Sequence, residues 1–231
     1  MLNNHLFILY ITVKRNETRG VVCVGTSSQL KSKQVIYDSL AYHYAIKCLN
    51  EDNTNVNKYI KKQCQQFIEC IDSEEYYIDI KSLKAIEGFL KLINIMPNKN
   101  AYDNLVGFQW FFITNIFCVK RKSNDKKRYE LSILLIARKN GRHFAWHIGK
   151  TLLTSLILML KMLLSDSRAE AYSIAPDREL SGQVYKELVK LIENSPAISK
   201  YFKVLRSEVR CTINNSVYKP LAFSINRLDG R

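Results

Sequence analysis

The chain of 231 residues has little glycine and little proline, eight and four residues respectively. Hydrophobic residues make up 47% of it. A disordered chain does not combine few Gly and Pro with so many apolar side chains. The length fits one large domain or two small ones and is enough to bury a core. The composition therefore predicts a globular protein.

The chain also lacks a cysteine framework. Its six cysteines include no CxxC pair and follow no regular spacing. In a chain of this length that pattern predicts reduced, cytosolic thiols that mostly fill the core. The six are Cys23, Cys48, Cys64, Cys70, Cys118 and Cys211.

Signals for export or membrane insertion are missing as well. Residues 6–13 are apolar but have neither a basic segment before them nor a small-residue cleavage site, which argues against a signal peptide. Residues 148–164 are too short for a membrane span and are interrupted by Lys150 and Lys161. We expect a soluble, cytoplasmic protein with no membrane partner.

Acidic residues are scarce: 21 of them stand against 35 basic ones, which gives a net charge of +14. An excess of this size favours a polyanionic partner, most simply double-stranded DNA, because lysine and arginine neutralise phosphates. A solvated basic surface is the alternative.

The most informative stretch is residues 131–164. Residues 131–137 form an apolar run typical of a buried parallel strand. A basic loop with Gly141 follows, and Gly149, Lys150 and Thr151 precede a long apolar segment with helical spacing. Strand, glycine-bearing loop and helix are the parts of a phosphate-binding loop, although Phe144 stands where G-x-x-x-x-G-K-[ST] has its first glycine.

Alternation of strands and helices after this stretch predicts a doubly wound α/β domain. Before it, the pattern is helical, after a β-rich beginning. The helices are expected over residues 37–48, 56–70, 80–95, 107–119 and 180–193, and the strands over residues 169–175, 201–205, 208–213 and 220–224.

Several blocks, in order from about residue 42 to the last residue, resemble the ATPase half of tailed-phage terminase large subunits. They are FQWFF (residues 108–112), LLIARKNG (134–141), YSIAPDRELS (172–181), FKVLRSE (202–208), PLA (220–222) and NRLDGR (226–231).

The resemblance implies a P-loop NTPase-like parallel sheet flanked by helices, with a helical lead-in, in an incomplete domain. The expected parts are a β-rich extension (residues 1–36), a helical lead-in subdomain (37–100) and a partial P-loop ATPase domain (101–231). It also implies ATP and Mg²⁺ as cofactors and Gln109 as the residue that recognises adenine, because a carboxamide donates and accepts at once.

Two alignments of the phosphate loop are open. In the first, residues 142–149 are an insertion. Lys150 then bridges the β- and γ-phosphates, Thr151 holds Mg²⁺, and Arg138 is the charge-stabilising arginine. The remaining contacts come from Lys139, Asn140, Gly141 and Gly149. In the second, Arg142 and His143 occupy the Lys and Ser/Thr places of the loop. A helix that begins near Arg142 then carries Lys150 roughly 12 Å along its axis, too far to contact phosphate.

The resemblance further implies a Walker B strand, with an Asp for Mg²⁺ and a Glu to activate water, and a nuclease half. No apolar run ending in Asp-Glu occurs in the sequence. We therefore expect the N-terminal portion of a DNA-packaging motor. Its partners would be double-stranded DNA, the small terminase subunit, the portal and a second chain with Walker B and nuclease parts. The alternative is a non-catalytic prophage remnant or basic nucleotide- or DNA-binding module.

Overall fold

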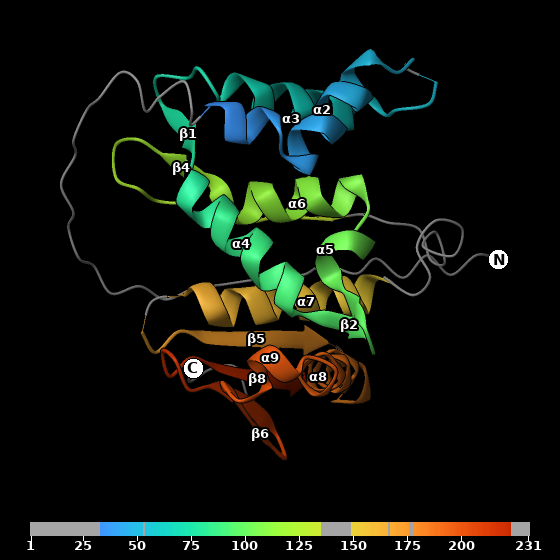
Figure 1. Cartoon of the computed structure of the whole chain (residues 1–231), viewed down its shortest axis with the longest axis vertical. Coiled ribbons are helices and arrows are strands. Elements are labelled where there is room, and N and C mark those ends of the chain that lie inside the picture. Colours follow the sequence, from blue (N-terminus) through green and yellow to red (C-terminus); the bar gives the residue numbers. More distant parts are fainter. Residues whose placement is uncertain (1–32, 53, 135–148, 166, 176–177, 223–231) are drawn as a thin grey trace. The chain divides into compact units, whose positions relative to one another are not determined.

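The computed structural model describes residues 33–52, 54–134, 149–165, 167–175 and 178–222. They form a mixed α/β fold with two compact units (Figure 1). The helical unit comprises the described residues of Glu17–Ile86 and Val106–Glu130. The sheet unit comprises those of Glu87–Leu105 and Leu131–Arg231. Each unit is made of segments that alternate along the chain. The predicted division into three consecutive parts, with boundaries after residues 36 and 100, stays a prediction.

The helical unit is built around α2 (Leu40–Asn50), which packs against α3 (Lys58–Glu69) and α6 (Gly107–Cys118). The rings of Tyr44 and Phe67 lie 5.4 and 5.3 Å from that of Phe111. These helices agree with those predicted over residues 37–48, 56–70 and 107–119. Cys48, Cys64, Cys70 and Cys118 are buried and form no disulfide bond among the described residues, as is the case for Cys211 of the sheet unit, whereas Cys23 lies outside the described residues.

Side chains close the first turn of each helix in this unit. Ser39 Oγ accepts the Tyr42 N–H at the start of α2, and Asn57 Oδ1 accepts the Tyr59 N–H at the start of α3. Such bonds satisfy amides that have no partner within the helix.

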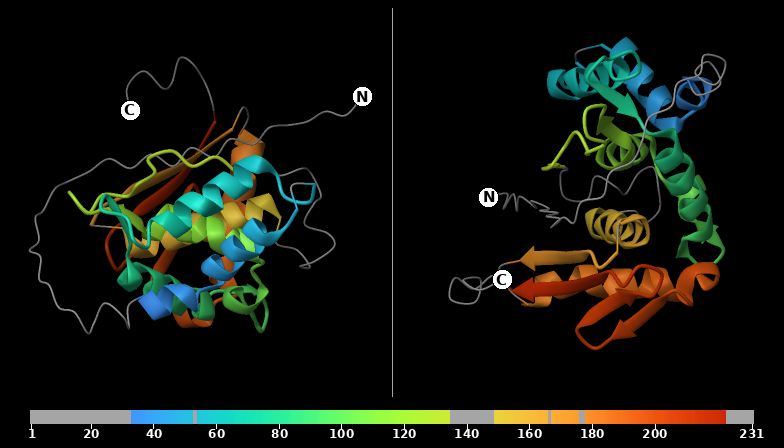
Figure 2. Two further views of the ribbon diagram at one scale, coloured as in Figure 1. Left: turned by 90° about the horizontal axis from the view of Figure 1, so that it is seen from above. Right: turned by 90° about the vertical axis from the view of Figure 1, so that its left-hand side faces the viewer.

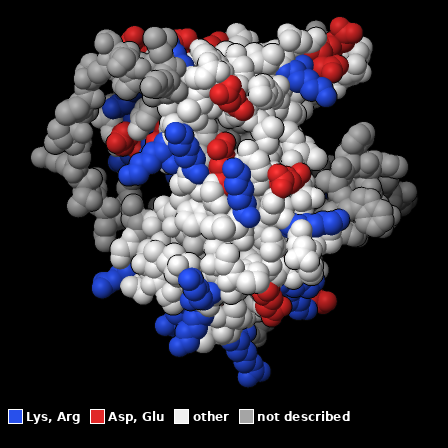
Figure 3. Space-filling view, viewed as in Figure 1, with Lys and Arg blue, Asp and Glu red and all other residues white. Residues whose placement is uncertain are grey.

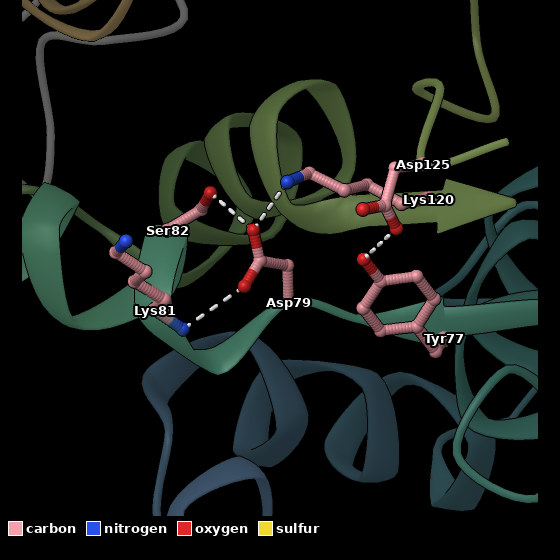
Figure 4. Close-up of polar contacts among 6 residues, drawn as sticks. All are labelled: Tyr77, Asp79, Lys81, Ser82, Lys120 and Asp125. Carbon is pink, nitrogen blue, oxygen red and sulfur yellow. Dashed lines mark hydrogen bonds and ion pairs between the residues drawn. The ribbon is translucent and has the colours of Figure 1, made fainter. Parts of the chain in front are cut away.

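A short antiparallel ribbon, absent from the sequence-based prediction, joins β1 (Tyr76–Ile78) to β4 (Val119–Arg121). Tyr77 donates its hydroxyl to Asp125 Oδ1 at 2.6 Å across the turn that follows β4 (Figure 4). The ribbon brings Lys120 of β4 beside Asp79, the residue before α4 (Ile80–Leu92).

Asp79 precedes α4 and gathers three donors there (Figure 4). Its carboxylate accepts the Lys81 N–H at 3.0 Å, the Ser82 hydroxyl at 2.6 Å and the Lys120 ammonium at 2.5 Å. Burial by itself would raise the pKa of Asp79, but the hydrogen bonds from Lys120 and Ser82 outweigh it and hold the pKa below its ordinary value.

The sheet unit begins with the end of α4 and a small hairpin of β2 (Asn94–Met96) and β3 (Lys99–Asn100), followed by α5 (Ala101–Asn104). Asn98 adopts a positive φ of 60° in the hairpin turn. The hairpin is attached to the end of α8 (Arg178–Glu193), because Ser195 Oγ accepts the Asn94 N–H at 2.8 Å.

The main sheet has four strands in the order β5-β8-β7-β6 (Figures 1 and 2). β5 (Glu170–Ala175) and β8 (Val217–Ala222) are parallel, whereas β7 (Glu208–Cys211) is antiparallel to β8 and to β6 (Phe202–Leu205). The predicted mixture of helices and strands is confirmed, each of the four predicted strands overlaps an observed one, and one of the three strand pairs is parallel. A wider parallel sheet stays a prediction.

Two helices belong with this sheet. α8 packs against β5, β8 and α7 (Lys150–Leu164), and it is followed by the short α9 (Pro196–Ser199). Ser155, fully buried in α7, donates its hydroxyl to the Val184 carbonyl of α8 at 3.0 Å. No helix in the described part of the chain is long and apolar enough to cross a membrane.

The strand predicted over residues 131–137 is not formed in its described part. Residues 131–134 have no regular structure, and Leu131 and Ile133 are 52% and 53% exposed. An apolar run becomes a strand only when another strand pairs with it, and hydrophobicity alone does not specify that pairing. Residues 135–137 lie outside the described residues.

Candidate functional site

The candidate site lies at the N-terminus of α7. Gly149 is the residue before the helix and has an extended backbone, with φ −75° and ψ 174°. Lys150 and Thr151 are the first two helical residues. Lys150 is therefore not two turns inside a helix that began near Arg142, so the second alignment is wrong about where the helix starts.

The far end of α7 is tied to the sheet. Asn214, in the turn before β8, donates from Nδ2 to the carbonyls of Met162 at 2.7 Å and Ser165 at 2.8 Å. Ser216 Oγ donates to the same Met162 carbonyl at 3.0 Å. These bonds satisfy carbonyls at the C-terminus of the helix and hold it where β5 and β8 begin.

The N-terminus of α7 must then lie near the opposite ends of these strands. The helix has 15 residues and spans about 22 Å, and the six residues of β5 span about 20 Å. A turn of a few residues reverses the chain between them. The N-terminus of α7 therefore lies toward the carboxyl ends of the parallel strands β5 and β8.

The N-terminus of α8 lies at this edge too, because α8 follows β5 directly. Helix N-termini present amide N–H groups and a positive dipole end, and both favour an anion. The carboxyl edge of parallel strands is also where open α/β sheets bind their ligands. The arrangement suits a phosphate group.

Buried hydroxyl groups connect the strands to α8 below this edge. Ser173 of β5 and Tyr218 of β8 share a hydrogen bond of 2.7 Å, and Ser173 Oγ donates to the Ser181 carbonyl of α8 at 3.3 Å. Burial raises the pKa of Tyr218 to about 12, so this phenol stays neutral at physiological pH. These contacts position α8.

Gln109 is placed differently from the other predicted site residues. It belongs to α6 of the helical unit and is only 2% exposed. Its Oε1 accepts the Val106 N–H at 2.9 Å and so closes the first turn of α6. To accept a hydrogen bond from adenine, Oε1 of Gln109 would have to break its bond to the Val106 N–H.

The other predicted site residues are Arg138, Lys139, Asn140 and Gly141, which lie outside the described residues. Within the described ranges, no group of three or more His, Cys, Asp or Glu side chains is arranged to hold a metal ion. Thr151 is partly exposed at the helix start.

Sequence reasoning missed Asn214, Ser216 and Asp79. They form hydrogen bonds at helix ends and have no periodic signal. Asn and Ser between two apolar runs indicate a turn, but the helix that such a turn serves is far away in sequence.

Comparison of the chain with protein-family models, with curated proteins and with solved structures finds no match.

Proposed function

We propose that this chain is the nucleotide-binding part of a DNA-packaging ATPase of the terminase type. The observation that carries the proposal is the position of Gly149, Lys150 and Thr151. They begin a helix at the carboxyl edge of a parallel strand pair, where a phosphate-binding loop begins its helix. The assignment to the terminase family rests on the sequence blocks that resemble terminases.

In this proposal ATP binds with its phosphates at the start of α7. Lys150 neutralises the β- and γ-phosphates, and the Thr151 hydroxyl is a ligand of Mg²⁺. Arg138 stabilises charge on the transferred phosphoryl group, while Lys139, Asn140, Gly141 and Gly149 provide backbone contacts. A Cβ atom built on Gly149 meets no atom within 4 Å among the described residues.

The partners follow from the same resemblance. They are double-stranded DNA, the small terminase subunit, the portal of the procapsid and a chain or segment with Walker B and nuclease residues. The place of action would be the cytoplasm of the host cell. ATP hydrolysis is expected only when the Walker B residues are supplied, because this sequence holds no such pair.

A second candidate is a module that binds nucleotide or DNA without hydrolysis, such as a prophage remnant. Two observations favour it: Gln109 is occupied as a helix cap, and residues 131–134 are not a strand. Both candidates would bind phosphate. Only the packaging ATPase would hydrolyse ATP once Walker B residues are supplied.

The test is equilibrium binding of a fluorescent ATP analogue with Mg²⁺ to the chain and to Lys150→Ala. We expect micromolar binding that weakens about tenfold or more in the variant, since bonds to charged groups are worth roughly 1.5–3 kcal/mol. Lys186→Ala, on the exposed side of α8, removes the same charge and should bind normally. Equal binding by Lys150→Ala would disprove the assignment of this loop.

A further inference from the structure

The β6–β7 hairpin carries a concentration of basic side chains. It consists of two four-residue strands joined by a turn at Arg206 and Ser207, and it reaches away from α7 in Figure 1 and in the right-hand view of Figure 2. Lys203, Arg206 and Arg210 are exposed on it. In Figure 3 the lowest part of the molecule, which holds this hairpin in Figure 1, shows mainly basic side chains.

Two of these charges face each other. Lys203 and Arg210 are direct partners in the antiparallel register, so both side chains leave the same face of the sheet. Like charges in this position destabilise a hairpin, because the Cβ atoms are about 5 Å apart. Their repulsion has to be offset by other groups.

The hairpin itself supplies one acidic side chain on this face. Glu208 accepts the Arg210 Nε–H at 2.6 Å and lies 3.5 Å from Lys219 Nζ of β8. One carboxylate is thus shared between two cations, while Lys203 and Arg206 have no ion pair among the described residues. The face retains a net positive charge.

Lysines on an edge strand also protect it from pairing with other chains. That role would explain Lys203, since β6 is the last strand of the described sheet. Edge protection does not explain Arg206 in the turn, nor Arg210 opposite Lys203.

We propose that the β6–β7 hairpin binds double-stranded DNA, with Lys203, Arg206 and Arg210 contacting the phosphate backbone. A two-stranded ribbon fits the major groove of B-form DNA, whereas the major groove of double-stranded RNA is too narrow for it. The phosphates offset the repulsion between Lys203 and Arg210. The inference names the DNA-contacting surface of the proposed packaging ATPase and rests on that proposal.

The first test is fluorescence anisotropy of a labelled DNA duplex titrated with the full chain at several salt concentrations. Lys203→Gln with Arg206→Gln should weaken binding about tenfold or more and lower the salt slope by about 0.9 for each phosphate that the variant no longer neutralises. The control, Lys186→Gln with Lys190→Gln on α8, makes the same charge change and should bind as the unaltered chain does. Equally weakened binding in both double variants would disprove a localised surface.

The single variant Lys203→Glu separates DNA binding from hairpin stability. It places opposite charges across the strand pair, so the midpoint of thermal unfolding should rise slightly while DNA binding falls. A role in edge protection would leave DNA binding unchanged, because glutamate protects an edge as well as lysine does, and that result would overturn the proposal. Duplex RNA competing as strongly as duplex DNA would overturn it too.

These measurements are made without nucleotide. If Lys150→Ala has no effect on ATP-analogue binding but the hairpin variants bind DNA weakly, only the nucleotide assignment fails. The reverse pattern rejects the hairpin alone.

Discussion

The helices of the helical unit and α7 of the sheet unit begin in different ways. Ser39, Asn57, Asp79 and Gln109 accept amide N–H groups at the starts of α2, α3, α4 and α6. α7 begins with Gly149, which has no side chain to accept any. A capping side chain satisfies amide N–H groups in the first turn of its own helix, whereas a glycine supplies no such acceptor.

This difference changes how the two predicted nucleotide contacts are understood. Gln109 and Lys150 both lie in the first turn of an apolar helix. The carboxamide of Gln109 is already used by its own helix, whereas Lys150 follows a glycine at the edge of the sheet where ligands bind. The structure assigns Gln109 a structural role as a helix cap, whereas ligand binding by Lys150 stays a proposal.

The largest effect is expected at the start of α4. Asp79→Ala removes the acceptor for Lys81 and Ser82 and leaves the partly buried Lys120 without its carboxylate, so unfolding free energy should fall by about 2 kcal/mol. Urea unfolding measures this. Asp72→Ala, which breaks an exposed pair with Lys33, is the control and should change the free energy by less than about 0.5 kcal/mol.

The same substitution gives a pH test. The pKa of Asp79 is lowered in the folded protein, so its contribution is present above the ordinary carboxyl pKa and is lost as pH falls through the lowered value. The stability difference between Asp79→Ala and the unaltered chain should shrink below about pH 4. A difference that persists unchanged at about pH 2, below the usual carboxyl range, contradicts this role.

A smaller effect is expected for Gln109. Replacing it with alanine should cost about 1 kcal/mol of unfolding free energy, because the Val106 N–H loses its acceptor. Gln109→Glu retains an acceptor but cannot donate to the adenine N7. If capping is the role of this residue, the glutamate variant binds the ATP analogue normally; binding weakened tenfold would restore the prediction that Gln109 reads adenine.

The smallest change in stability is expected at Gly149. Gly149→Asp adds a capping acceptor and should raise the unfolding free energy by a few tenths of a kcal/mol. The added carboxylate repels phosphate, so binding of the ATP analogue should weaken by about tenfold or more. Gly149→Ser supplies the cap without the charge and should bind more tightly than the aspartate variant. Equal affinities would show that phosphate does not bind there.

Short-range signals in the sequence predicted much of the fold. The spacing of apolar residues over residues 37–48 and 80–95 predicted α2 and α4, and Leu83, Ile86 and Leu90 of α4 are buried. The predicted strands at β5, β6, β7 and β8 are present, with ends that differ by a few residues. β1 and β4 were missed because a three-residue strand shows no periodicity.

The site was only partly predictable. The residue types Gly, Lys and Thr before an apolar helix pointed to α7, but two alignments placed the start of that helix differently. The observed start at Lys150 distinguishes them. Residues 131–134 show the limit of such patterns, because their apolar run matched a strand that the structure does not form.

The sequence by itself determined the helices, the reduced and buried state of the described cysteines and the basic charge, because these depend on local spacing and composition. The cap at Gln109 is a local contact as well, because its partner Val106 lies three residues away, although no periodic pattern signals it. Only the tertiary structure decided which strands pair, that Asn214 holds the end of α7 and that Lys203 faces Arg210. Each of these depends on a hydrogen bond or a register between residues of different elements, which the spacing within one element does not specify.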